Sequence, residues 1–211
     1  MIHLKRFKIF FLNSIIVIIS SIILQIIRLG FNIYVSNKIS TEALGVFHLI
    51  MATYMFGITL AASGINISCM RIVSEELAFG NSDGIKKASE KCIKISLCIS
   101  LIASLIFYIN DDIIAKYGFQ EKVGTNIIHL ICIALPLISV SSAISGYFVA
   151  VRRVYKNVIG QFFEQISKVI TIVLLFNCFS DGTLENSCFL LILGDVISEI
   201  VCLVYSIITY K

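Results

Sequence analysis

The sequence predicts an all-α, polytopic membrane protein with six spanning helices, and its composition is the first reason. Mean hydropathy is +0.95, and charged residues make up 14% of the 211 residues, against about 25% in soluble domains. The second reason is six long apolar stretches, since about 20 residues of helix cross a hydrocarbon layer of roughly 30 Å. We expect a single bundle with spans at residues 10–35, 45–69, 93–109, 126–151, 158–179 and 187–209.

The amino end has the basic-then-apolar order of a signal peptide. Lys5, Arg6 and Lys8 precede an apolar run of about 25 residues, and no small-residue cleavage site follows it. We therefore expect this run to remain as the first span.

Basic residues follow an alternating distribution among the loops. Twelve lie before span 1, between spans 2 and 3, between spans 4 and 5, and after span 6, whereas only Lys38, Lys116 and Lys122 lie on the other side. The bias predicts that both termini are in the cytoplasm and that the protein is multi-pass in the cell membrane. Basic residues beside spans indicate membrane lipids as partners, and not nucleic acid.

The longest connection on the basic side, residues 71–94, has a pattern of its own. Apolar and acidic residues alternate up to Phe79, and Gly80-Asn81-Ser82-Asp83-Gly84 follows. We expect a short interfacial helix that ends in a turn. An ordinary solvated loop is the alternative.

Five ionisable residues fall inside the predicted spans: Arg28, Glu164, Lys168, Asp195 and Glu199. Each costs about 2.5 to 3.5 kcal/mol at a helix centre, whereas a leucine or isoleucine returns about 0.3 to 0.6 kcal/mol. Such charges face a protein interior or an aqueous cavity, so a pathway for a polar substrate is the default hypothesis. We assign Arg28, Glu164 and Lys168 to substrate binding, and Asp195 and Glu199 to ion coupling.

Each of these charges also has a structural interpretation. Glu164 and Lys168 are four residues apart and are able to pair along one helix face. Asp195 and Glu199 have the same spacing but the same sign, so their repulsion favours binding of a proton or cation, unless Glu199 snorkels to the surface. The guanidinium of Arg28 suits bidentate phosphate binding, or it snorkels outward.

The remaining polar features favour packing over chemistry. Pro136 is expected to kink span 4, with Ser139 or a neighbouring helix binding the freed carbonyl. Ser63-Gly64 in span 2 and the serines of span 4 permit close helix approach. The seven cysteines lie mostly in apolar runs without metal-binding spacing, so we expect no metal, no cofactor and no disulfide framework. No catalytic constellation is present, which argues against an enzyme.

Several short motifs follow one another along the chain. They are Ile26-Ile27-Arg28-Leu29-Gly30-Phe31, residues 40–47, Ala62-Ser63-Gly64-Ile65, residues 71–76 with Gly80-Asn81, Ala134-Leu135-Pro136, Ser145-Gly146-Tyr147-Phe148, and Gln161, Glu164, Gln165 and Lys168. Together they resemble a family of polysaccharide exporters in the multidrug/oligosaccharidyl-lipid/polysaccharide superfamily, and their order and spacing make the match more specific than any one motif.

The resemblance implies a flippase for lipid-linked oligosaccharide or polysaccharide precursors, including a peptidoglycan precursor during spore formation, that works by alternating access. Family members have about twice as many spans in two related bundles, so this chain corresponds to the first bundle. We expect a second six-helix half, or a second copy of this chain, as its partner. The alternatives are a cation-coupled multidrug exporter of the same superfamily and a membrane subunit or truncated remnant without transport activity.

Overall fold

The structure is a computed structural model that describes residues 2–119, 124–179 and 181–210. This part of the chain is helical and has no strand, as the sequence predicts. Six helical segments are long and apolar enough to cross a membrane. The helices are α1 (Ile2–Lys38), α2 (Thr41–Ala62), α3 (Ile65–Ala78), α4 (Ser82–Ile109), the short α5 (Asp111–Ile113), the π-helical turn η1 (Ile114–Gly118), α6 (Asn126–Ala150), α7 (Val154–Phe179) and α8 (Leu184–Tyr210).

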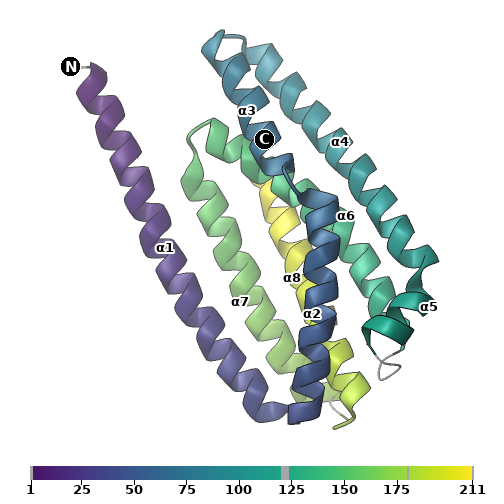
Figure 1. Cartoon of the computed structure of the whole chain (residues 1–211). Coiled ribbons are helices and arrows are strands. Elements are labelled where there is room, and N and C mark those ends of the chain that lie inside the picture. The colour runs from purple at the N-terminus through teal and green to yellow at the C-terminus, as the bar shows by residue number, and fades with distance from the viewer. Residues whose placement is uncertain (1, 120–123, 180, 211) are drawn as a thin grey trace.

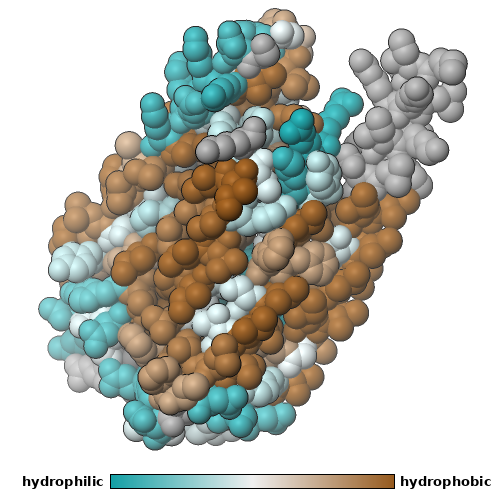
Figure 2. Space-filling view, turned by 180° about the vertical axis from the view of Figure 1, so that it is seen from behind, coloured by the Kyte–Doolittle hydropathy of each residue, from teal (hydrophilic) through white to brown (hydrophobic). Residues whose placement is uncertain are grey.

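The six segments run side by side and cross back and forth (Figure 1). Ile2 and Tyr210 lie at one side, which we call the terminus side, and the connection between α1 and α2 lies at the opposite side. Hydrophobic residues form a broad band, with hydrophilic residues gathered at both ends (Figure 2). Glu121, Lys122 and Lys211, which belong to the charge pattern, lie outside the described residues.

The helix α4 begins earlier than expected from the apolar residues alone. It starts at Ser82, where Asn81 caps it by accepting a hydrogen bond from the Gly84 amide at 3.0 Å. The expected interfacial helix is the end of α3, and the turn after it is shorter than the sequence suggests. Gly80 makes this turn possible because its φ of 71° is in the left-handed region that glycine tolerates. A hydropathy pattern marks the apolar part of a helix and misses its polar continuation.

The second predicted span is interrupted between α2 and α3. Ser63 is extended and Gly64 has a φ of 78°, so the helical hydrogen bonds stop there. Hydrogen bonds with α6 are formed on both sides of the break. Ser139 Oγ donates to the carbonyl of Ala61 at 3.0 Å, and Asn66 Nδ2 donates to the carbonyl of Ser142 at 3.3 Å. Unpaired backbone groups cost several kcal/mol in a bilayer, so the hydrogen bond from Ser139 to the Ala61 carbonyl helps to make the break tolerable.

Pro136 in α6 is compensated in a similar way. Proline has no amide hydrogen, so the carbonyl of Cys132 loses its partner within the helix. Ser104 Oγ of α4 donates to that carbonyl at 2.8 Å. Of the two partners expected from the sequence, the neighbouring helix supplies the hydrogen bond, while Ser139 is engaged with Ala61 and with α4.

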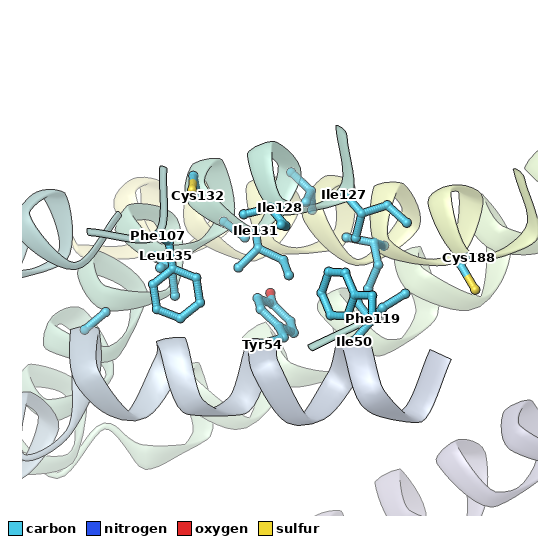
Figure 3. Packing of buried hydrophobic residues seen from close by; sticks show 14 of the residues in the cluster. Ile50, Tyr54, Phe107, Phe119, Ile127, Ile128, Ile131, Cys132, Leu135 and Cys188 are labelled. Atoms are coloured by element: carbon cyan, nitrogen blue, oxygen red, sulfur yellow. The ribbon is translucent and has the colours of Figure 1, made fainter. Parts of the chain in front are cut away.

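The main core lies between α2, α4, α6 and α8, with η1 and Phe119 at one end. Its side chains interlock between the facing helices (Figure 3). Fully buried members include Ile50, Phe119, Ile127, Ile128, Ile131, Leu135, Cys188 and Ile192. The helices α6 and α8 therefore form the centre of the molecule, with about half of their apolar windows buried.

The first helix lies at the edge of the molecule. It packs along α7 through Leu24, Phe31 and Val35, which share one helix face. From Ile15 to Ile19 its side chains are exposed. The helices α1 and α2 meet at their connection and diverge towards the terminus side (Figure 1). The charged residues of the spans lie where α1 still contacts α7.

Candidate functional site

The five ionisable residues of the spans come from three helices and gather at mid-depth. Arg28 lies ten residues before the end of α1 at Lys38, and Asp195 lies eleven residues after the start of α8 at Leu184. At 1.5 Å per residue both are about 15 Å from the opposite side of the molecule. Since a hydrocarbon layer is roughly 30 Å thick, the cluster lies near its middle.

Lys168 and Asp195 form an ion pair between α7 and α8 in which the carboxylate is buried and the lysine is half-buried. Lys168 Nζ lies 2.6 Å from Asp195 Oδ1, and the Asp195 side chain is 7% exposed. The two helices approach closely here, which Gly194 permits because any larger side chain at this position would collide with Ile172. Lys168 also lies 5.7 Å from the centre of the Phe31 ring on α1. The pair thus connects α7 to α8, with α1 beside it.

This pairing differs from the expected contact between Glu164 and Lys168 along α7. Within the described residues, the ion pair of Lys168 is made with Asp195 on the neighbouring helix. Glu164, one turn away on α7, is half-buried and remains partly accessible. Asp195 is buried, so its charge is more costly without a counter-charge. It also changes the expected repulsion between Asp195 and Glu199, since Lys168 offsets the charge of Asp195.

Arg28 is held in a different way. Its Nε donates a hydrogen bond of 3.2 Å to Oε1 of Gln165 on α7. Gln165 is only 5% exposed, whereas Arg28 is exposed. Arg28 is on the face of α1 that carries Leu24 and Phe31, so its side chain is directed to α7. A buried neutral amide therefore holds an exposed cation.

Glu164 and Glu199 complete the cluster, and both are half-buried. Glu164 interacts electrostatically with Arg28 and Lys168. Glu199 interacts with Glu164 and Asp195, and less strongly with Lys168. The cluster thus contains three carboxyl groups and two basic groups. No three potential metal ligands among the described His, Cys, Asp and Glu residues are close enough to hold one ion.

Two neutral residues of the site are missed by an inspection of charges. Tyr54 of α2 is buried, and its hydroxyl is near enough to Glu199, Asp195 and Glu164 to feel their charges, so α2 is a fourth helix beside the site. Gln165 is the second. Its signal in the sequence is its position between Glu164 and Lys168, since residues three apart share a helix face. Tyr54 has no comparable signal.

Six apolar helical segments long enough to cross a membrane, with charged side chains gathered between three of them, define a polytopic membrane protein. The chain belongs to the polysaccharide biosynthesis protein family, whose model matches residues 11–211. It is 20% identical over 202 residues to stage V sporulation protein B of Bacillus subtilis (strain 168), covering 96% of this chain and 39% of that relative. The chain thus spans well under half the length of this curated relative. No solved structure matches the chain.

Proposed function

We propose that the chain forms one bundle of a flippase that moves a lipid-linked oligosaccharide or polysaccharide precursor across the cell membrane by alternating access. The family and the relative support this class of substrate, and a peptidoglycan precursor in spore formation is the specific candidate. In this proposal both termini are cytoplasmic, so the terminus side faces the cytoplasm. The lipid tail remains in the bilayer while the polar head group crosses beside the charged cluster.

The observation that carries the proposal is the exposed cation at mid-depth. Arg28 has its Nε engaged by Gln165, and an anionic head group is the natural ligand for the rest of its guanidinium. Glu164 and Lys168 lie beside it and bind the same head group. An arginine that served only packing would be expected to have a carboxylate partner or to be covered, because an unpaired charge in a bilayer is costly.

The acidic residues of α8 are assigned to ion coupling. Asp195 and Glu199, together with Glu164, exceed the basic groups of the cluster in number. A proton or a monovalent cation bound at these carboxylates would compensate the excess. Because Lys168 is paired with Asp195, such binding is linked to the position of Lys168 and hence to the substrate.

A single six-helix bundle offers one wall of a pathway, so we propose that it works with a second bundle. That partner is either a further six-helix half or a second copy of this chain. The proposal rests on the share of the relative that the chain covers and on α1, whose apolar side chains from Ile15 to Ile19 are exposed. Mass measurement of the purified protein in detergent distinguishes a monomer from a dimer.

A cation-coupled multidrug exporter is the second candidate function, and the surplus of carboxylates favours it. A drug exporter depends on the acidic pair, so Asp195→Asn would abolish efflux while Arg28→Ala would have a smaller effect. A lipid-linked substrate reverses this order, because the anionic head group requires Arg28. A subunit or remnant without transport activity would show neither effect.

The proposed function is tested by reconstitution of the protein in vesicles that contain a fluorescent lipid-linked oligosaccharide. We expect head groups to move between leaflets, as measured by access of a membrane-impermeant quencher, and Arg28→Ala to remove most of this movement. Equal rates for wild type, Arg28→Ala and protein-free vesicles would contradict the proposal. Dimeric mass with activity would identify the second copy as the partner.

A further inference from the structure

The two cations of the cluster have partners of different charge. Lys168 faces the carboxylate of Asp195, which is buried and offsets its charge. Arg28 faces the amide of Gln165, which accepts a hydrogen bond without offsetting the charge. Both partners are about equally buried, at 5% exposure. The difference between them is therefore chemical and not a difference in access to solvent.

The hydrogen bond with Gln165 uses only one of the N–H groups of Arg28. A guanidinium has five N–H donors in a planar fork, and its Nε edge and its outer edge are distinct. Gln165 occupies Nε. In the described part of the chain, no hydrogen bond or ion pair is formed by the two terminal amino groups, so this outer pair is free to bind two oxygens of one anion.

The surrounding charges do not close this edge. Glu164 on α7 is near enough to interact electrostatically with Arg28, yet no ion pair within 4 Å joins them in the described structure. Asp195 of α8 is engaged by Lys168. Phe31, one turn along α1, covers Lys168 and not Arg28. Gln165 is thus the group that fixes the direction of Arg28.

We propose that Gln165 is a positioning residue for anion binding: its neutral carbonyl orients Arg28 through Nε and keeps the charge and the outer edge of the guanidinium available for a phosphate group. The inference rests on the proposed function, which assigns Arg28 to the head group. It adds that the residue at 165 must be both a hydrogen-bond acceptor and uncharged. A glutamate there accepts the same hydrogen bond but pairs with Arg28.

The test measures binding of dodecyl phosphate to the full chain in detergent by native mass spectrometry, with dodecanol as the matched ligand without phosphate. Gln165→Leu removes the acceptor, and we expect binding of dodecyl phosphate to weaken about three- to tenfold. Gln165→Glu keeps the acceptor and adds a charge, and we expect it to weaken binding about 10- to 100-fold. Binding of dodecanol stays within about twofold in both variants, which a loss of packing alone would not produce.

Gln161→Glu provides the control, because Gln161 lies one turn earlier on α7 and is exposed. It adds the same charge without touching the Arg28 contact, and we expect less than about a threefold change. Gln165→Met replaces Gln165→Leu should the latter not fold, since it has a similar length and lacks the acceptor.

The inference is overturned when Gln165→Glu binds dodecyl phosphate as tightly as the wild type, or when Gln161→Glu weakens binding as much as Gln165→Glu. The proposed function fails separately. If Arg28→Ala binds like the wild type, the assignment of Arg28 is wrong, and the role of Gln165 falls with it. If Arg28→Ala loses binding while both Gln165 variants keep it, only the role of Gln165 is refuted.

Discussion

Arg28 and Lys168 lie in one cluster, yet they differ in their exposure and in the charge of the group that each contacts. Lys168 lies between α7 and α8, is 2.6 Å from a buried carboxylate and is covered by an aromatic ring. Arg28 lies on the edge helix, contacts a neutral amide and is exposed. The first arrangement offsets a charge inside the protein, whereas in the second the contacting group carries no charge. The two charges in the spans therefore differ in the group that each contacts, a carboxylate for Lys168 and a neutral amide for Arg28.

The same contrast separates the helices that carry these residues. The helix α8 is central, with 56% of its apolar window buried, and α1 is peripheral, with 11% buried. A residue on α8 is fixed by its neighbours, whereas α1 contacts mainly α7. We therefore expect the Lys168–Asp195 pair to contribute to the stability of the bundle. Arg28 is expected to contribute to binding and little to folding.

The largest effect on stability is expected from Lys168→Met. It leaves Asp195 buried without a counter-charge, so the free energy of unfolding should fall by about 3–5 kcal/mol. Thermal unfolding in detergent measures this change. The double variant Lys168→Met/Asp195→Leu removes both charges and should recover most of the loss. A single variant as stable as the wild type would show that the ion pair does not stabilise the bundle.

A smaller effect is expected from Phe31→Leu. This change keeps an apolar residue of similar burial but removes the ring that lies over Lys168. We expect a loss of about 1–2 kcal/mol, from the cation–π interaction and the smaller side chain. Combining it with Lys168→Met tests the assignment, since the loss from Phe31→Leu should shrink when the cation is absent. Strictly additive losses would show that the ring acts by packing alone.

The smallest effect on stability is expected from Arg28→Ala. Its contact is one hydrogen bond to a neutral acceptor, which is worth about 0.5–1.5 kcal/mol. The same variant should have the largest effect on head-group movement in vesicles. Lys168→Met should therefore reduce stability more than Arg28→Ala does, whereas Arg28→Ala should reduce head-group movement more. A loss of several kcal/mol for Arg28→Ala would place Arg28 among the structural charges.

The membrane fold is predictable from the sequence because apolar length and hydropathy depend on local residues. The six spans and the helical class follow directly, whereas the break at Ser63–Gly64 does not. A hydropathy window averages over a serine and a glycine and sees one continuous span. The break depends on Ser139 and Asn66, whose bonds across helices become visible only once α6 is placed.

The members of the site were easier to predict than its contacts. Five charged residues in apolar stretches are conspicuous, so Arg28, Lys168 and Asp195 are found from the sequence. The partners of these residues are not found in this way. Lys168 has Glu164 one turn away on its own helix, yet it pairs with Asp195 on α8. Gln165 and Tyr54 are neutral, and nothing in their residue type separates them from other buried polar side chains.

In the proposed function, Arg28 lies at mid-depth and is reachable by a polar ligand. The most direct test is Arg28→Cys in a background without the seven native cysteines, treated with a membrane-impermeant polar thiol reagent in vesicles. The control is Ile192→Cys, because Ile192 is 1% exposed in the core. We predict that the cysteine at position 28 is labelled and that the one at position 192 is protected. Protection of position 28 in every condition, with reagent applied from either side, would show that a polar ligand does not reach Arg28.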